Sequence, residues 1–432
     1  MADSRPRSIA GLSRSEKEKL LLRLLSEKNR KRPPEERTSL TERAILDDAV
    51  LDPRIQAIGK AKTIREPRVI LLTGATGFLG AHLLSDLCRL TEARIYCLLR
   101  DDSVQTARSR LDTNFRKYFD RPPDEKRVIP VVGDLSKPAL GLRRERLEEL
   151  AGEVDTVWHC GAHVSHLLDY GSLKAINVSS TIEILKLATS RRPKVVHFIS
   201  SLIAAVEQDA EGRLVEDVPG GLPPAMPGGY ALTKWVSERI LAQAMERGVP
   251  VRIYRPGILC GQRVRGVWPF EKDHLLHALK GCVQMGFAPR TQLSLDMLPV
   301  DFASEALVRM SLLAQGDNAV FNLSNPHAAT WVELIQWANL DRQNLTLVPE
   351  DEWREKHLRH IRPDNALYSM LPLYLAPEAR QQQERIVSRL ERVEIRNAAS
   401  ALAACGLTFP KVDRDLWTTY FDYLRGEGHL PG

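Results

Sequence analysis

Short apolar runs alternate with stretches of helical spacing over much of the chain. The runs hold four to six residues each, and several contain almost no polar side chain. Continuous apolar runs of this length are typical of parallel strands that are buried on both faces. Because segments long enough for helices separate most of them, we predict an α/β fold with a doubly wound parallel sheet. We expect the strands at Val69–Thr73, Arg94–Leu99, Val128–Val132, Thr156–His159 and residues 195–200, 251–254 and 320–323.

The regular alternation fades after about residue 257, so we divide the chain into three parts. Residues 1–66 are predicted to form a helical N-terminal arm, and residues 67–257 the domain that contains the sheet. Residues 258–432 are predicted to form a smaller, mostly helical lobe for the substrate. One strand of this lobe, at about residues 319–323, is expected to return to the sheet.

Two S-x-x-E sequences, at residues 13–16 and 39–42, predict the starts of two helices in the arm, because each side chain of such a box binds a free backbone N–H group of the other residue. The first helix should end at Pro33-Pro34 and the second before Pro53. Residues 1–68 hold 17 basic and 11 acidic residues, whereas the rest of the chain holds 44 of each. The first helix, basic and with a leucine stripe, either covers the surface of the body or docks a partner. The neutral body argues against nucleic-acid binding.

The composition is that of an ordinary globular protein, with 43% hydrophobic and 27% charged residues. No run of 18 apolar residues occurs, so we expect no membrane span. The first ten residues lack the apolar segment of a secretory signal. The six cysteines form no C-x-x-C pair, which favours reduced thiols in a cytoplasmic protein.

A glycine-rich sequence follows the first strand directly. Residues 74–80 read G-A-T-G-F-L-G and lead into a predicted helix. Glycine permits a tight turn and a close approach of a pyrophosphate, and the N-terminus of the helix then faces the phosphates with free N–H groups. The position between strand and helix predicts a Rossmann-type dinucleotide-binding domain. The expected cofactor contacts are Gly74, Thr76, Gly77, Phe78, Leu79 and Gly80.

The second strand ends at Arg100, at the position where an acidic residue would bind the ribose hydroxyls of NAD. Arginine there favours the 2′-phosphate of NADP. Asp101 and Asp102 follow, but they lie beyond the strand. Arg110 is either a second phosphate contact or a solvated charge on a helix.

A Tyr-x-x-x-Lys sequence places Tyr230 and Lys234 one helical turn apart. The ammonium group should favour the phenolate and lower the pKa of Tyr230 toward the working pH. Ser200 and Ser201 lie at the end of a predicted strand about thirty residues earlier, where they would supply a hydroxyl beside the phenol. We therefore predict Ser201, Tyr230 and Lys234 as catalytic residues, with Ser200, Tyr230 and Lys234 also in contact with the cofactor.

In combination these motifs resemble the extended short-chain dehydrogenase/reductase superfamily. More closely, the chain resembles the thioester reductase domains of nonribosomal peptide synthetases, polyketide synthases and carboxylic acid reductases. The stretches that carry this resemblance are TGATGFLG at residues 73–80, CLLR at 97–100, GDL at 133–135, GYALTKW at 229–235, RPG at 255–257, VDF at 300–302 and ILDDAVLDP at 45–53.

The resemblance implies further cofactor contacts. Asp134 and Leu135 would bracket the adenine, and Pro256 and Gly257 would close over the nicotinamide. The segment after the fourth strand would line the nicotinamide side, through Cys160, Gly161 and Ala162. Three nearby histidines, His159, His163 and His166, are expected to line this region or the core rather than to bind a metal.

The implied function is an NADPH-dependent reductase that releases an acyl or peptidyl thioester from the phosphopantetheine arm of a carrier protein as an aldehyde. Further reduction to the alcohol stays open, as do the acyl chain and the oligomeric state. One alternative is a nucleotide-sugar epimerase or dehydratase of the same superfamily, which would favour tightly held NAD. The other is a non-catalytic protein that senses NADP. Arg100 argues against the first alternative, and the presence of both Tyr230 and Lys234 argues against the second.

Overall fold

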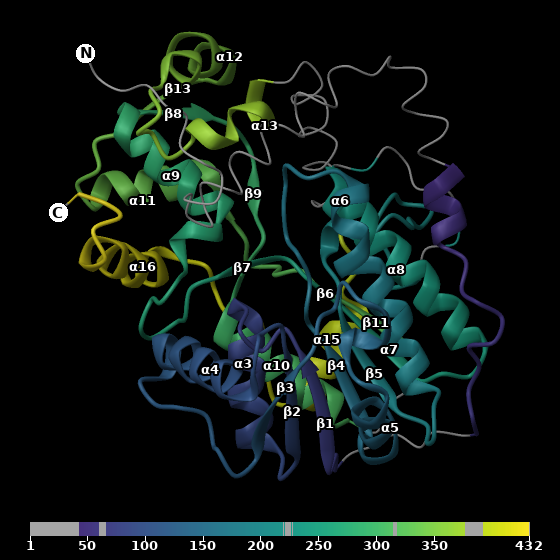
Figure 1. Cartoon of the computed structure of the whole chain (residues 1–432). Coiled ribbons are helices and arrows are strands. Elements are labelled where there is room, and N and C mark those ends of the chain that lie inside the picture. Colours follow the sequence, from purple (N-terminus) through teal and green to yellow (C-terminus); the bar gives the residue numbers. More distant parts are fainter. Residues whose placement is uncertain are drawn as a thin grey trace, which may run out of the picture.

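A seven-stranded parallel sheet forms the centre of the molecule (Figure 1). The computed structural model describes residues 43–59, 66–218, 220, 226, 228–313, 318–375 and 392–431. The strands follow the order β3-β2-β1-β4-β5-β6-β11 across the sheet. Their bounds are β1 (Val69–Thr73), β2 (Arg94–Leu99), β3 (Val128–Val132), β4 (Thr156–His159), β5 (Val195–Ile199), β6 (Val251–Pro256) and β11 (Ala319–Leu323). The predicted parallel sheet is therefore confirmed, and the last strand joins it beside β6.

Two hydrophobic cores flank the sheet, because successive side chains of a strand point to opposite faces. Leu71 lies in one core, whereas its neighbours Ile70 and Leu72 lie in the other. Helices α5 (Arg144–Glu153), α7 (Ser180–Ala188) and α8 (Gly228–Glu246) cover the first core. Helices α3 (Phe78–Leu90), α4 (Val104–Phe119), α10 (Val300–Ser311) and α15 (Arg396–Ala404) cover the second. This is the doubly wound arrangement expected from the sequence.

The lobe beyond the sheet has its own core around Trp268 and Trp417 (Figure 1, upper left). Its longer helices are α9 (His274–Met285), α11 (Trp331–Leu340) and α16 (Arg414–Gly426), and its short ones are α12 (Glu350–Glu352) and α13 (Leu371–Leu375). The structure adds three small two-stranded sheets that the sequence pattern did not predict. They pair β7 (Ile258–Cys260) with β10 (Met297–Pro299), β8 (Phe287–Arg290) with β13 (Thr346–Pro349) and β9 (Ser294–Leu295) with β12 (Ala329–Thr330).

Residues 43–58 pack against the sheet domain instead of leaving it. Residues 43–48 are helical, and Ile45 and Leu51 are buried in the first core. Arg247, directly after α8, donates hydrogen bonds to three backbone carbonyls of this segment, and Asp48 accepts hydrogen bonds from Tyr170 and Lys174 of α6 (Tyr170–Lys174). The division predicted at residue 66 therefore assigns to the arm a segment that belongs to the body. The predicted first helix, before Pro33, lies outside the described residues.

The carboxyl ends of all seven strands lie at one edge of the sheet, and the strand order reverses between β1 and β4. In open α/β sheets, ligands bind at such a switch point. No helix among the described residues is both long and apolar enough to cross a membrane.

Candidate active site

The glycine loop follows β1 at the switch point of the sheet. Gly74 has a φ of +78°, and a Cβ atom there would lie 2.7 Å from the backbone nitrogen of Gly161. A Cβ atom on Gly80 would lie 1.9 Å from the carbonyl oxygen of Gly74. Both positions therefore need glycine. Helix α3 starts directly after Gly77. No side chain caps this end of the helix, so its first N–H groups are not bound by a capping side chain.

The remaining residues of this motif differ in exposure. Thr76 is half-buried beside the turn, and Leu79 is buried in the second core. The Phe78 ring packs against His82 and Tyr118. Only the backbone of Leu79 is thus available to a ligand.

The loop after β4 lies against the glycine loop. The Gly161 N–H group donates to the hydroxyl of Thr73 at 2.9 Å, and that hydroxyl lies 2.8 Å from Nδ1 of His159. His159 Nε2 lies 3.1 Å from the hydroxyl of Ser180, which itself donates to the carbonyl of Ile176. His159 must then carry its proton on Nε2. Burial, together with nearby Lys234, lowers the pKa of His159 to about 3, so the ring is a neutral link in the core.

A cavity of about 510 Å³ opens beside the ends of β2 and β3. Both arginines predicted from the sequence, Arg100 and Arg110, line it, together with Asp134 and Lys137. Arg110 lies 3.4 Å from Asp101. Burial raises the pKa of Asp134, but hydrogen bonds from Ser136 and the charge of Arg100 outweigh this and lower it.

Lys137 is an exposed third cation at this cavity that our sequence analysis did not predict. The sequence could have indicated Lys137 through its position, three residues after Asp134 and just beyond the G-D-L stretch. Leu135 points toward the loop after β4, since a Cβ atom on Gly161 would lie 2.5 Å from the Leu135 side chain.

Helix α8 carries both Tyr230 and Lys234. The Lys234 ammonium donates to the carbonyl of Ile199 at 2.6 Å and lies 4.6 Å from the centre of the Phe198 ring. Because Ile199 ends β5, this bond fixes the helix against the segment that continues into Ser200 and Ser201. Burial lowers the pKa of Lys234 to about 8, although Cys160 and Glu238 act in the opposite direction.

The prediction that the pKa of Tyr230 is lowered was wrong for this structure. Burial raises the pKa of Tyr230, and Cys160 raises it further. The ammonium of Lys234 faces the carbonyl of Ile199, so its stabilisation of a phenolate does not offset the loss of water. Tyr230 is therefore a neutral phenol at pH 7, which is the form that can donate a proton.

The two serines after β5 have different surroundings. Ser201 is half-buried with extended backbone, at the start of a short 3₁₀ turn. Ser200 is buried, and its hydroxyl donates to Glu238 at 2.5 Å. The side chain of Ser200 thus faces the core, and its backbone N–H group donates to the carbonyl of Tyr254 at 2.7 Å, so neither of these donors is free for the cofactor contact predicted for it.

Asn177 links the loop after β4 to α8, and the sequence analysis did not identify it. It lies in a π-helical turn, Ala175–Ser179, and is buried. Its side chain accepts from the N–H group of His163 at 2.7 Å and donates to the hydroxyl of Thr233 at 3.0 Å. Such turns often occur at functional sites. Cys160 and Ala162, in the same loop, are both half-buried.

Gly257 follows Pro256 at the end of β6, against a buried carboxylate. A Cβ atom on Gly257 would lie 2.6 Å from Oδ2 of Asp296. Burial raises the pKa of Asp296 to about 6. The close contact explains why residue 257 is glycine, and Asp296 is a second residue that the sequence motifs did not indicate.

The loop after β4 also meets the lobe. The rings of His166 and His274 are 5.5 Å apart, and His274 Nε2 lies 2.8 Å from the Tyr374 hydroxyl. Within the described part of the chain, no three metal-ligating side chains gather into a group that could hold a metal ion.

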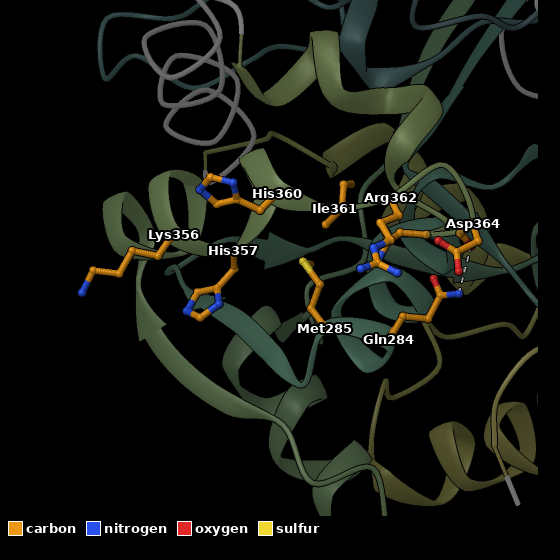
Figure 2. A pocket seen from close by; sticks show the side chains of 9 residues that line it. Gln284, Met285, Lys356, His357, His360, Ile361, Arg362 and Asp364 are labelled. Atoms are coloured by element: carbon orange, nitrogen blue, oxygen red, sulfur yellow. Dashed lines mark hydrogen bonds between the residues drawn. The ribbon is translucent and has the colours of Figure 1, made fainter.

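A second cavity, of about 340 Å³, lies wholly in the lobe, far from the predicted site residues in sequence. Figure 2 shows the rings of His357 and His360 and the guanidinium of Arg362 around Met285. Asp364 also lines it, and Lys356 pairs with Glu352 at 3.0 Å. These carboxylates offset the positive charge, so we assign no ligand to this cavity.

Comparisons with known proteins agree with this geometry. Residues 72–307 match the NAD-binding family described as male sterility protein. The chain is 34% identical over 398 residues to a component of the linear gramicidin synthase of Brevibacillus parabrevis and also to the isonitrile lipopeptide synthase of Streptomyces coeruleorubidus. Both alignments cover 90% of this chain, but only 8% and 26% of those proteins.

Among solved structures, the chain is similar to the terminal R domain from the myxalamid PKS-NRPS biosynthetic pathway. The two are 35% identical with a TM-score of 0.82, and the match covers 90% of this chain and 99% of that one.

Proposed function

Because this chain belongs to the NAD-binding family described as male sterility protein, we propose that it is an NADPH-dependent reductase that releases a carrier-bound acyl or peptidyl thioester as an aldehyde. The bond from Lys234 to Ile199 carries the proposal, since it holds the Tyr-x-x-x-Lys helix against the strand end that leads into Ser201. The likeness to an R domain of a polyketide and peptide synthetase supports the substrate class. The chain spans less than a third of the two synthetases, so their substrates are not carried over.

The residues at the switch point fit a dinucleotide. Glycine at positions 74 and 80 lets the turn pack closely against Gly161 and against the start of α3, whose first N–H groups have no side-chain cap and would bind a pyrophosphate. The cavity with Arg100, Arg110 and Lys137 favours the 2′-phosphate of NADPH over NADH. Asp134 and Leu135 would hold the adenine end, and Cys160, Gly161, Ala162, Pro256 and Gly257 the nicotinamide end.

NADPH would supply a hydride to the thioester carbonyl carbon. Tyr230, a neutral phenol, donates its proton to the oxygen that gains negative charge, and the hydroxyl of Ser201 is a second donor. Lys234, protonated below about pH 8, stabilises the phenolate that results and binds the nicotinamide ribose. The thiohemiacetal then loses its thiolate, while Tyr230 takes the hydroxyl proton back. The products are an aldehyde and, after protonation by water, a free thiol.

We further propose an acyl or peptidyl carrier protein as the partner, since a phosphopantetheine thioester has to be presented to the site by the protein that holds it. The basic N-terminal helix predicted from the sequence would dock it, with apolar side chains for affinity and basic ones for an acidic partner. We place the enzyme in the cytoplasm, where its six free cysteines would stay reduced.

NADPH oxidation with an acyl-pantetheine thioester, followed by absorbance and by trapping of the aldehyde, tests the proposal. We expect one aldehyde per NADPH, or one alcohol per two NADPH. Tyr230→Phe is the control for chemistry at this site. A chain that binds NADPH but reduces no thioester would instead be a sensor, and release of a sugar nucleotide product would favour the epimerase or dehydratase.

A further inference from the structure

A buried ion pair lies directly behind the candidate active site. Glu238 of α8 and Arg255 of β6 have side chains that are 0% and 1% exposed. Arg255 Nη2 lies 2.6 Å from Oε2 of Glu238, and its Nε lies 3.0 Å and 3.2 Å from the two carboxylate oxygens. Removing two charges from water is costly, and well-packed apolar residues often stabilise a fold as well or better. The stability of the fold alone therefore does not explain this pair.

The carboxylate of Glu238 has a third donor, the hydroxyl of Ser200 at 2.5 Å. Ser200 immediately precedes Ser201. Glu238 itself follows Lys234 by one helical turn, and Arg255 immediately precedes Pro256. Three separate segments of the site are thus joined at one carboxylate.

The rest of the Arg255 guanidinium holds a fourth segment. It donates to the carbonyls of Val215 and Asp217, at 3.2 Å and 2.7 Å, and to the side-chain oxygen of Asn322 at 3.3 Å. Val215 and Asp217 lie in the connection between Ser201 and Tyr230. All three guanidinium nitrogens of Arg255 therefore have hydrogen-bond partners. Each partner lies either in a segment that leads to a predicted site residue or in β11, at the edge of the sheet.

We infer that Glu238 is a positioning residue for the proposed reduction: through Ser200 and Arg255 it holds the backbone segments of the site in register. This role rests on the proposed function. Because the side chains of Ser200, Glu238 and Arg255 are all buried, they act through the backbone segments that they hold. Carbonyl reduction needs the two proton donors aligned with one oxygen, and a misplacement of about 1 Å can cost on the order of 10²-fold in rate.

Ser200→Ala is the variant of choice, because it removes one bond and leaves Oε1 of Glu238 paired with Nε of Arg255. We expect kcat to fall on the order of tenfold, with the KM and Kd for NADPH within about twofold of the wild type. Ser311→Ala is the matched control. Its buried hydroxyl also makes one bond, to Val308 at 2.6 Å, at the end of α10. It should lower the Tm comparably and leave kcat unchanged.

Glu238→Gln is a second variant that keeps an oxygen for Ser200 but places an NH₂ group against Arg255. We expect a larger loss of kcat and a lower Tm, and Ser200→Ala decides the matter if this variant does not fold. Wild-type kcat in Ser200→Ala, or a rise in KM alone, would overturn the inference.

Crystal structures of Ser200→Ala and Ser311→Ala give a readout that does not need turnover. The inference expects the Ser201 hydroxyl to shift relative to Tyr230 in the first and not in the second. An unmoved Ser201 overturns it. Absence of thioester reduction by the wild-type chain is a different result and counts against the proposed function only.

Discussion

Arg100→Ala is the sharpest test of the cofactor assignment. Arg100 lines the cavity between β2 and β3, and none of the described carboxylates lies within ion-pair distance of it. A hydrogen bond to a charged group contributes about 1.5–3 kcal/mol, and solvent at an exposed side chain reduces this to about 1–2 kcal/mol. The Kd for NADPH should therefore rise about 5- to 30-fold. The Kd for NADH, which lacks the phosphate, should stay nearly constant.

Both constants can be measured by titration of cofactor fluorescence at low and high salt. The difference between the wild type and Arg100→Ala should shrink as salt screens the exposed charge. Arg144→Ala is the matched control, because Arg144 is an exposed arginine that pairs with Glu148 on α5 and does not line the cavity. An equal loss for NADPH and NADH would refute the assignment of Arg100 to the 2′-phosphate.

A second substitution in the same cavity should have the opposite effect on the affinity for NADPH. Asp101 pairs with Arg110 at 3.4 Å, so its charge competes with a phosphate for that arginine. Asp101→Asn keeps a side-chain oxygen for the neighbouring N–H group of Asp102. We expect NADPH to bind about two- to fivefold more tightly, with NADH unchanged. Weaker binding of NADPH would mean that Asp101 instead holds Arg110 in place.

Three further predictions concern the chemistry and the partner. Tyr230→Phe should lower kcat about 10²-fold or more while NADPH still binds, since a general acid contributes on that order; nearly unchanged single-turnover rates would place the proton donor elsewhere. Burial lowers the pKa of Lys234 to about 8, and a lysine loses its proton as pH rises through its pKa, so kcat/KM should fall above about pH 8; a profile that stays flat to about pH 10, near the ordinary lysine pKa, would contradict this. Deletion of residues 1–34 should raise the KM for a carrier-bound thioester, more so at low salt, and hardly change the rate with acyl-pantetheine; a parallel loss with both substrates would show a structural role for this segment.

The sheet was predictable because its strands are buried on both faces. Ile70, Leu71 and Leu72 are apolar whichever core they face, so a single sequence shows an uninterrupted run. The lobe lacks such a signal. Strand β9 has two residues and pairs with another of two, and so short a strand has no period. Residues 43–58 were assigned to the arm because they precede the first strand, although Ile45 and Leu51 already offered apolar contacts.

Several motif residues lie along one edge of the sheet because the carboxyl ends of parallel strands share that edge. Sequence order was therefore enough to place Gly74, Arg100 and Ser201 there. The electrostatics were less accessible. The spacing of Tyr230 and Lys234 indicated that they lie close together, but the pKa of Tyr230 also depends on the water lost on burial. The direction of the shift was therefore wrong when it was argued from spacing alone.

Asn177 and Glu238, which the sequence did not indicate, both have partners in distant segments. Asn177 bonds Thr233, 56 positions away, and Glu238 bonds Ser200, 38 positions away. A buried asparagine or glutamate looks like any other polar residue in a helix until its partners are known. The predicted catalytic residues follow motifs because reaction chemistry fixes their type and spacing. The buried residues that support them need only form hydrogen bonds with one another, so many residue pairs could fill these positions. Which pair is present can be seen only in the folded chain.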